Sequence, residues 1–417
     1  MCGICGQYNY ASQAPIVASD IEAMMNSMVH RGPDDAGLFL SGAVGFGFRR
    51  LSIIDLAGGH QPMSDAAKQV WTVFNGEIYN YRELRHELVH HGHTFRTNSD
   101  TEVIVHGYKE WGDEVLNRLH GMFGLAIWDS PRRRLLLARD PMGIKLVYFR
   151  QAEGGLHFGS EIRPILASCA HRPSVDPVAL NLFLRYRYAP SPLTLYSGIR
   201  KLAPGAKLVA ENGAIRIERW WRFRPTPFDP PPSVDQAEEE LLAVYESAVR
   251  RHLISDVPVG LLLSGGVDSA LLLSLMNRVG KSWDTVTVGY GESYRQDELT
   301  EAKRTAAVLG SRHHSVEISR SDFEASLAGV VRCLEEPIAS SSIVPMYFVC
   351  QEARKHVKVA LIGQGPDELL GGYRRHLGVR YGSLWRELPG WARGAAKSVL
   401  NHIPRGEGSK EDCTPST

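Results

Sequence analysis

The sequence predicts two domains of different class: a sandwich of packed β-sheets, then an α/β domain built on a parallel sheet. Apolar strand-like segments with few helices between them fill the first half, which favours packed sheets over βαβ units. A run with five prolines in eight residues, Pro225–Pro232, then interrupts the chain and cannot lie inside a sheet or a helix. Beyond it, strands and helices alternate, which indicates parallel strands with helices on both faces.

The first half contains several segments with strand or helix signals. Val70–Phe74 is strand-like and runs into Asn75-Gly76, a dipeptide typical of turns. Met122–Trp128 and Leu135–Ala138 are expected to be two buried strands joined by a turn. A short helix is expected after Tyr79, because apolar residues recur there at helical spacing.

The second half opens with a helix that has clear start and stop signals. Ser233 and Gln236 have the spacing of a capping box, and Arg250-Arg251 complement the carboxyl end of the helix dipole. After it we expect strands at Val257–Leu263, Trp283–Val288, Ser315–Ile318 and Val357–Ile362, and helices at Val267–Val279 and Glu301–Leu309.

Composition excludes several classes of protein. With 43% hydrophobic and 22% charged residues, the chain is globular rather than disordered or fibrous. A net charge of +1 gives no reason to expect a nucleic-acid partner, and no apolar run is long enough for a membrane helix. The N-terminus lacks signal-peptide features, and the six cysteines are scattered. We therefore expect a cytoplasmic protein; its oligomeric state stays open, a homodimer included.

Cys2 is the first candidate catalytic residue. A small second residue permits removal of Met1, which would place the thiol beside its own α-amine, a base with a pKa of about 7.7–8.0. A cysteine at position 2 is weak evidence alone. It belongs, however, to the first of five segments that occur in a fixed order: Cys2–Gly6, His30–Asp35, Arg50–Asp55, Asn75–Asn80 and Ser99–Glu102. Together they resemble the class II, or N-terminal nucleophile, glutamine amidotransferase domain. The resemblance implies an αββα sandwich.

The resemblance implies that Cys2 attacks the side-chain amide of glutamine. The Asn75 side chain and the Gly76 backbone N–H would then form the oxyanion hole, where glycine permits a close approach. The alternative for Asn75-Gly76 is an ordinary hairpin turn.

The same resemblance assigns three charged residues to glutamine binding. Arg50 would hold the α-carboxylate of glutamine, and Glu77 and Asp100 would accept hydrogen bonds from its α-ammonium. The alternatives are an exposed strand charge for Arg50 and a helix N-cap for Asp100. Cys5 is expected to be structural.

A second candidate site lies where a predicted strand meets a predicted helix, at Leu263–Ser269. Its sequence, Leu-Ser-Gly-Gly-Val-Asp-Ser, would direct backbone N–H groups and a helix N-terminus at phosphate oxygens. It is neither a Walker A loop nor a dinucleotide fingerprint, and a plain tight turn is the alternative. The run resembles the pyrophosphate loop of the ATP pyrophosphatases. A second block, Ile362–Tyr373, resembles the glycine-rich acidic motif of asparagine synthetases.

These resemblances imply an ATP–Mg²⁺ site. ATP would contact Leu263, Ser264, Gly265, Gly266, Asp268, Ser269, Val288, Ile362 and Gly363. Asp268 and Asp367 would be the Mg²⁺ ligands. Asp297-Glu298 lies where the family has acidic residues, and no role is assigned to it.

Both halves together resemble the glutamine-hydrolysing asparagine synthetase family. The implied reaction is adenylation of a carboxylate, ordinarily that of L-aspartate, followed by attack of ammonia released at Cys2. The expected domains are residues 1–224 (amidotransferase), 225–233 (linker) and 234–417 (ATP-binding). A different acceptor carboxylate, and glutaminase activity alone, are the alternatives.

Two departures from the family pattern affect the predicted synthetase site. Position 364 is Gln, where the family has an acidic residue that helps the adenylate react, so a change in acceptor chemistry is expected there. Only 44 residues follow Tyr373, which predicts an ATP-binding domain that is incomplete at its C-terminus. A degenerate chain that only binds nucleotide or a partner is a third alternative, and the retained Cys2 and phosphate loop argue against it.

Overall fold

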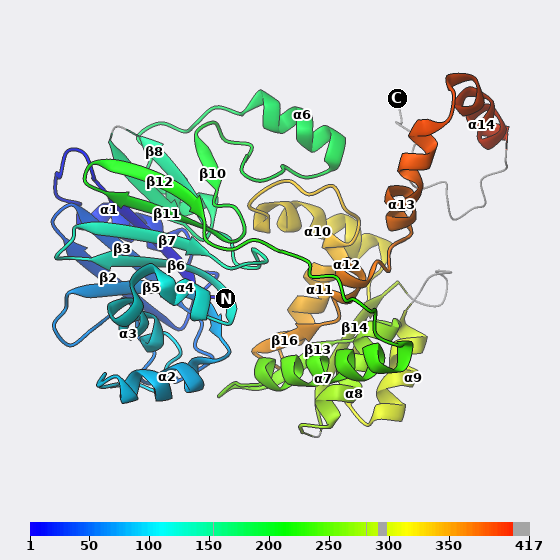
Figure 1. Cartoon of the computed structure of the whole chain (residues 1–417), viewed down its shortest axis with the longest axis horizontal. Helices are drawn as coiled ribbons and strands as arrows, with labels where there is room; N and C mark the ends of the chain where they lie inside the picture. The colour runs from blue at the N-terminus through cyan, green and yellow to red at the C-terminus, as the bar shows by residue number, and fades with distance from the viewer. Residues whose placement is uncertain (153, 281, 291–297, 403–417) are drawn as a thin grey trace. The chain divides into compact units, whose positions relative to one another are not determined.

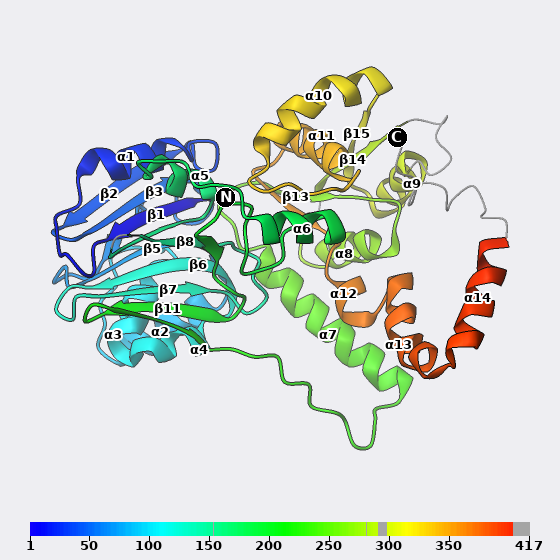
Figure 2. The same ribbon diagram turned by 90° about the horizontal axis from the view of Figure 1, so that it is seen from above.

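The computed structural model describes residues 1–152, 154–280, 282–290 and 298–402. It divides into two compact units, Met1–Ile362 and Gly363–Thr417. Residues 1–219 form a β-rich half of the first unit, and an α/β half follows from residue 234 (Figure 1). Residues 221–233 between them contain neither helix nor strand, and Figure 2 shows them as an extended connection to the next helix. The prediction that the proline-rich run interrupts regular structure is confirmed.

The first sheet of the β-rich half has six antiparallel strands. Their order is β10 (Ile199–Lys201), β8 (Tyr148–Ala152), β9 (Gly155–Gly159), β1 (Gly3–Tyr8), β3 (Val44–Arg50) and β2 (Asp35–Ser41). Helices α1 (Ala18–Asn26) and α5 (Ile162–Ala167) cover its outer face. Met24, Met25 and Ile21 of α1 pack on Cys5 of β1. A further helix, α6 (Pro177–Tyr186), precedes β10.

The second sheet also has six strands and carries its helices on the opposite side. Their order is β12 (Ala214–Arg219), β11 (Ala206–Glu211), β7 (Arg134–Arg139), β6 (Gly121–Asp129), β5 (Val70–Ile78) and β4 (Met63–Ser64). Helices α2 (Tyr81–His90), α3 (Glu102–Trp111) and the short α4 (Val115–Arg118) bury Leu84, Leu88 and Ile104 against it.

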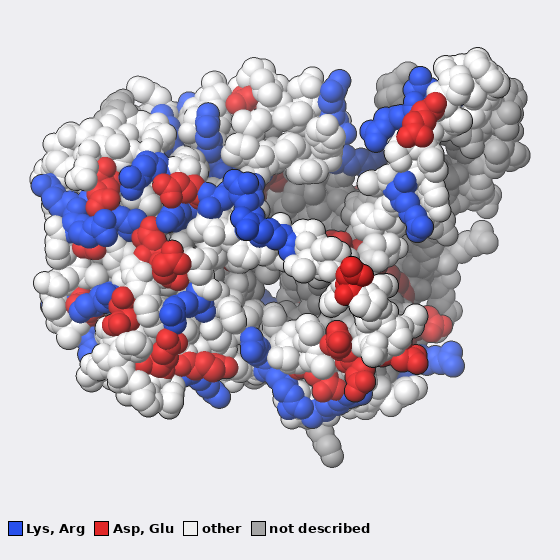
Figure 3. Space-filling model, viewed as in Figure 1, with Lys and Arg blue, Asp and Glu red and all other residues white. Residues whose placement is uncertain are grey.

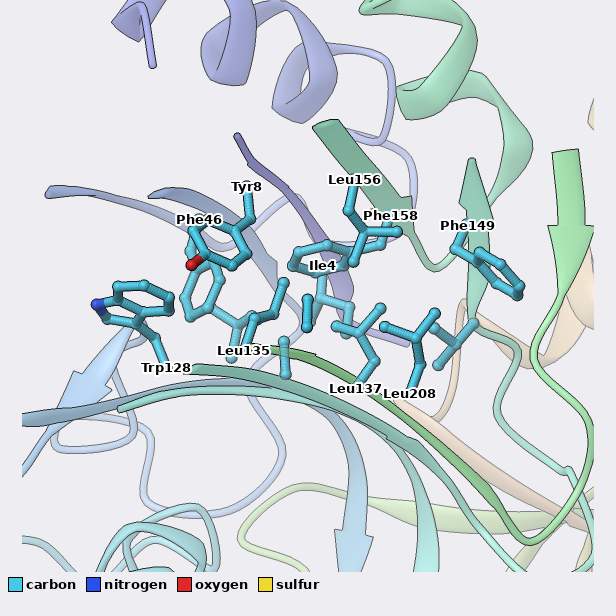
Figure 4. Close-up of a cluster of buried hydrophobic side chains, with 14 of the residues drawn as sticks. Ile4, Tyr8, Phe46, Trp128, Leu135, Leu137, Phe149, Leu156, Phe158 and Leu208 are labelled. Atoms are coloured by element: carbon cyan, nitrogen blue, oxygen red, sulfur yellow. The ribbon is translucent and has the colours of Figure 1, made fainter. Parts of the chain in front are cut away.

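The main core of this half lies between the two sheets. Ile4 and Phe158 from the first sheet meet Leu137 and Leu208 from the second, and all four side chains are fully buried (Figure 4). Each such residue contributes about 1.5–3 kcal/mol relative to an exposed position. In Figure 2 the sheets are stacked between α1 with α5 and α2 with α3. The predicted αββα sandwich is confirmed.

Strand β5 contradicts the predicted turn at Asn75-Gly76. Both residues lie inside the strand and pair with Gly124 and Phe123 of β6. A Cβ on Gly76 would lie 2.0 Å from the Met122 carbonyl oxygen, so the close approach of β6 requires glycine here. Pairing along the whole of β6 therefore overrides the local turn preference of the dipeptide.

The α/β half is built on a four-stranded parallel sheet. The strand order is β15 (Arg312–Glu317), β14 (Asp284–Gly289), β13 (Val259–Leu262) and β16 (Val359–Ile362). Helices α7 (Val234–His252), α8 (Val267–Asn277) and α9 (Leu299–Leu309) share one apolar cluster with Leu261, whereas α11 (Ile343–Ala353) packs on Val286 in another. The predicted parallel sheet is confirmed, and so is the capping box of Ser233 and Gln236. Helix α10 (Arg320–Cys333) and α11 were not predicted.

The second unit consists of helices in the part that the structure describes. These are α12 (Pro366–Leu370), α13 (Arg374–Glu387) and α14 (Gly390–His402).

Cys413 and the polar C-terminal residues lie outside the described residues, and the other five cysteines are free thiols. No helix among the described residues has the length and hydropathy that a membrane span requires. Lys and Arg side chains are interspersed with Asp and Glu over the β-rich half in Figure 3, as the near-zero net charge implies.

Candidate active sites

Cys2 precedes β1, and its thiol lies against the chain that leaves β3. Leu51 donates its backbone N–H to Cys2 Sγ at 3.4 Å, and the thiol donates to the Leu51 carbonyl at 3.6 Å. Arg31 Nε donates to the Cys2 carbonyl at 2.9 Å, which fixes the backbone of the nucleophile. Burial raises the pKa of the Cys2 thiol, so a base is needed to generate the thiolate.

Asn75 and Gly76 are consecutive residues of β5, and each carries a hydrogen-bond donor. Asn75 is buried, and its Nδ2 has no hydrogen-bond partner. The N–H groups of Phe74 and Ile78 both leave the ladder to bond the side chains of Gln61 and Asp100. Because alternate residues of a strand direct their N–H groups to the same side, the Gly76 N–H shares that side. A buried donor without a partner is costly in the free protein, and an oxyanion would satisfy it.

Glu77 and Asp100 form a buried carboxylate pair. Asp100 Oδ2 accepts the Ile78 N–H at 3.0 Å, and both residues are less than a tenth exposed. Burial, reinforced by the charge of Asp100, raises the pKa of Glu77 to about 7. Burial likewise raises the pKa of Asp100 to about 6. Two buried carboxylates without a bound cation are unfavourable, and an ammonium group placed between them would relieve this. Asp100 is not the predicted helix cap, because Thr101 occupies that position without a side-chain bond.

Arg50 ends β3 and is buried rather than exposed. Its guanidinium donates to the carbonyls of Leu56 at 2.9 Å, Ile54 at 3.2 Å and Asp55 at 2.6 Å. The alternative of an exposed strand charge is therefore wrong. The guanidinium is instead held by the turn that follows it.

Asp55 organises this turn and was not singled out from the sequence. It has a left-handed φ of 50°, which Asp tolerates better than most residues. Its carboxylate accepts the N–H groups of Gly58 at 2.9 Å and Asn98 at 2.8 Å. Asp55 thus joins the turn that holds Arg50 to the segment that carries Asp100. A lone Asp in a loop gives no signal of such long-range bonds.

Lys145 is a second residue that sequence reasoning did not assign. Asp140 accepts the N–H groups of Ile144 and Lys145 at 2.9 Å each, which folds this loop. The Lys145 side chain is buried, and burial lowers its pKa while the charge of Glu77 opposes that change. A single lysine in a loop gives no signal in the sequence that its side chain is buried near Glu77.

The predicted phosphate loop connects β13 to α8. Ser264 and Ser269 place their hydroxyl oxygens 2.9 Å apart, and Ser264 Oγ also accepts the Gly266 N–H at 3.2 Å. Gly265 donates its N–H to Glu298 Oε2 at 3.2 Å. Gly266 is the N-cap of α8, and no side chain caps the helix. Two hydroxyls, an uncapped helix N-terminus and the Asp268 carboxylate in the first turn suit a phosphate with Mg²⁺.

Parallel pairing brings several predicted ATP contacts to one edge of the sheet. Leu263 follows β13, Val288 lies near the end of β14, and Ile362 ends β16. The carboxyl ends of parallel strands share an edge, where α/β proteins bind ligands. Of the acidic pair after β14, Glu298 is placed by the structure and Asp297 lies outside the described residues.

The remaining predicted residues belong to the second unit. Gly363 and Gln364 precede α12, and Gln364 is exposed. Asp367 lies in the first turn of α12, and its carboxylate packs on Gly372, where a Cβ would lie 1.7 Å from Oδ1. Glu368 accepts bonds from Gly365 N at 3.0 Å and Tyr373 Oη at 2.8 Å. The glycine-rich block is thus folded around its own acidic residues.

Comparison with known proteins shows the family to which the chain belongs. A family model for the glutamine amidotransferase domain matches residues 1–221, more than half of the chain, so the protein is a member of that class. A second model, for asparagine synthase, matches residues 240–410. A putative glutamine-hydrolysing asparagine synthetase of Methanocaldococcus jannaschii is 30% identical over 94% of this chain and 79% of its own length. The chain belongs to the glutamine-hydrolysing asparagine synthetase family.

Two further similar proteins are a relative compared by sequence and a solved structure. Asparagine synthetase [glutamine-hydrolyzing] 1 of Bacillus subtilis is 37% identical over the whole of this chain. The present chain spans 66% of that relative, slightly less than two thirds. A structure of B. subtilis glutamine phosphoribosylpyrophosphate amidotransferase shares 16% identity, with 82% of this chain and 72% of that chain covered. Its TM-score of 0.41 is too low to support any argument.

Proposed function

We propose that this protein hydrolyses glutamine at Cys2 and uses the released ammonia, with ATP, to convert a carboxylate into an amide. L-Aspartate is the proposed acceptor and L-asparagine the product. The observation that carries the proposal is the presence, within one compact unit, of a cysteine nucleophile beside a buried acidic pair and of an uncapped phosphate loop. Neither site alone requires the other, and ammonia is the chemical link between them.

The glutaminase step uses residues of the β-rich half. Cys2 Sγ attacks the amide carbon of glutamine, ammonia leaves, and water then releases glutamate from the thioester. Asn75 Nδ2 and the Gly76 N–H stabilise the oxyanion. Glu77 and Asp100 bind the α-ammonium, and Arg50 binds the α-carboxylate through the guanidinium N–H groups that are not bonded to the turn. The unpartnered Asn75 amide and the raised pKa values of the two acids support these roles.

The synthetase step uses the phosphate loop and the residues around it. A carboxylate oxygen of the acceptor attacks the α-phosphorus of ATP, and pyrophosphate leaves. Ammonia then attacks the carbonyl carbon, and AMP leaves with the C–O bond electrons. Ser264, Gly265, Gly266 and Ser269 hold the phosphates, while Leu263, Val288, Ile362 and Gly363 contact the nucleoside part. Asp268 would hold Mg²⁺ at the loop, where the ion would neutralise phosphate charge, and Asp367 stays a ligand predicted from the sequence alone.

The proposed domain limits follow the chain interruption. Residues 1–224 form the amidotransferase domain, 225–233 the linker and 234–417 the ATP-binding domain. The irregular segment 221–233 and the capping box that starts α7 support these limits. A cytoplasmic location and a homodimer stay predictions.

A different acceptor carboxylate is the second candidate, favoured by Gln364. An amide has the size of a carboxylate but cannot accept a proton at neutral pH, so the step after adenylation would lack a base at this position. Gln364→Glu should raise the rate of asparagine synthesis if aspartate is the native acceptor.

One incubation separates these candidates. The protein is given glutamine, ATP, Mg²⁺ and aspartate, and glutamate, asparagine and pyrophosphate are quantified. Equal amounts of asparagine and pyrophosphate support the proposal. Glutamate without pyrophosphate, with aspartate or any other carboxylate, would leave only a glutaminase. Pyrophosphate that requires a different carboxylate would replace aspartate as acceptor.

A further inference from the structure

The turn that holds Arg50 is hydrogen-bonded to Asp256 of the α/β half. Asp256, which precedes β13, accepts the Asp55 N–H at 2.7 Å through Oδ2, and its own N–H donates to the Ile53 carbonyl at 3.0 Å. These two bonds bracket Ile54. The carbonyls of Ile54 and Asp55 are two of the three that hold the Arg50 guanidinium.

Lys358 of the α/β half also reaches the same segment, through an ion pair with Asp34. Lys358 immediately precedes β16, and its Nζ lies 2.6 Å from Asp34 Oδ2. The same oxygen accepts the Ser52 N–H at 2.8 Å, and Ser52 follows Leu51, the residue in contact with the Cys2 thiol. Both members of the ion pair are about one third exposed, so the pair adds little to stability. Its effect is to orient the Asp34 carboxylate toward Ser52.

Asp256 and Lys358 lie three residues and one residue before two neighbouring strands of the parallel sheet. Strands β13 and β16 are neighbours with Val259 opposite Val359, and the Pro258 carbonyl accepts the Lys358 N–H at 3.1 Å. The chain before β13 therefore bonds the turn at 51–55 directly through Asp256, and the chain before β16 reaches it through Asp34. The carboxyl ends of these strands lead into the phosphate loop and into Ile362. Each strand is four residues long, about 13 Å, so only a short stretch of paired strand separates the turn from the other edge of the sheet.

We propose that Asp256 and Lys358 are positioning residues for glutamine, supplied by the ATP-binding half to the turn at residues 51–55. This inference rests on the proposed glutaminase function. The turn holds Arg50 through its carbonyls and touches Cys2 through Leu51, so its placement determines where the glutamine α-carboxylate and the nucleophile meet. Because β13 connects Asp256 to the phosphate loop at its other end, we expect occupation of that loop to change the turn.

The test uses the full chain with Asp256→Ala and Lys358→Met, singly and together. Matched controls are Lys355→Met, whose ion pair with Glu352 stays inside the α/β half, and Asp235→Ala in the first turn of α7. The KM for glutamine should rise about tenfold in each single test variant, with kcat changed less than threefold and a Tm close to that of the controls. Values of KM equal to those of the controls would overturn the proposal.

A second measurement does not depend on activity. Hydrogen exchange of a peptide covering residues 50–56 should be at least threefold faster in the double variant than in either control. Asp256→Ala removes the acceptor of the Asp55 N–H, and Lys358→Met removes the ion pair that holds Asp34, the acceptor of the Ser52 N–H. ATP with Mg²⁺ should slow this exchange at least twofold in the unaltered protein and not in the double variant. Unchanged exchange on adding ATP would overturn the link between the two sites. Absence of glutaminase activity in the unaltered protein would refute the proposed function. The exchange data would still show whether Asp256 and Lys358 hold the turn at residues 51–55.

Discussion

The carboxylate of Glu298 lies on the backbone N–H of Gly265, 3.2 Å from Oε2 to N, where a phosphate oxygen is expected to bind. Gly265 is in the phosphate loop, and Glu298 precedes α9. A carboxylate is itself an anion, so Glu298 competes with pyrophosphate for the Gly265 N–H.

Glu298→Gln should therefore tighten binding of pyrophosphate with Mg²⁺, with Kd lowered about three- to tenfold. Isothermal calorimetry on the full chain measures this. Glu301→Gln is the control, because Glu301 also lies beside Gly265, with its Cβ 3.2 Å from where a Cβ on Gly265 would be, and the net charge changes by the same amount. Weaker binding in the Glu298 variant alone would mean that this carboxylate supports the ligand instead of competing with it.

Cys2→Ala should abolish glutamine hydrolysis, with a loss of about a thousandfold or more, because no other group supplies the thiolate. Synthesis of the amide with added ammonium should persist, since the phosphate loop is untouched. Cys5→Ala is the control: its thiol is fully buried against Gly47 and takes no part in the chemistry. Glutamate release by the Cys2 variant would disprove the assignment of the nucleophile.

Glutamine affinity should depend on pH through Glu77 and Asp100. Their carboxylates must be ionised to bind an ammonium, and burial raises their pKa values to about 7 and about 6. The KM for glutamine should therefore fall as pH rises from 6 to 8. Glu77→Gln should flatten this profile above pH 6.5, and a profile unchanged by the substitution would remove Glu77 from the site.

The same two acids should make the free protein less stable as pH rises. An acid whose pKa is higher in the folded state binds protons more tightly there, so stability is greatest at low pH and is lost between about pH 4 and pH 7. The loss for Glu77 is on the order of 2 kcal/mol. Urea unfolding at pH 5 and pH 7.5 measures it. The pH dependence should shrink in Glu77→Gln; an equal dependence in both proteins would contradict the raised pKa.

Gly76→Ala should destabilise the sandwich by about 1–3 kcal/mol and reduce glutaminase activity, because the added Cβ would overlap the Met122 carbonyl oxygen. The control is Gly329→Ala in α10, where a Cβ meets no neighbouring atom and alanine favours the helix. Thermal unfolding of both variants tests this. A Gly76 variant as stable as the unaltered protein would show that β6 can shift away.

Local sequence signals predicted much of the fold. The strands at 122–128 and 135–138, the capping box at Ser233 and the alternation after it all depend on residues close together in the chain. The turn expected at Asn75-Gly76 failed because pairing with β6, almost 50 residues away, outweighs a two-residue preference. Helices α10 and α11 carried no strong amphipathic pattern and were missed.

The sequence by itself determined which groups are present and in what order: a thiol at position 2, an Asn-Gly-Glu run, and a phosphate loop between a strand and a helix. Only the tertiary structure decided that Arg50 is held by three carbonyls and that Glu77 and Asp100 share one buried environment. It also decided that Asp256 bonds the turn beside Cys2 and that Lys358 reaches it through Asp34. The physical reason is distance along the chain. Helix periodicity and capping act over a few residues, whereas burial, raised pKa values and hydrogen bonds between residues 200 or more positions apart exist only once the chain has folded.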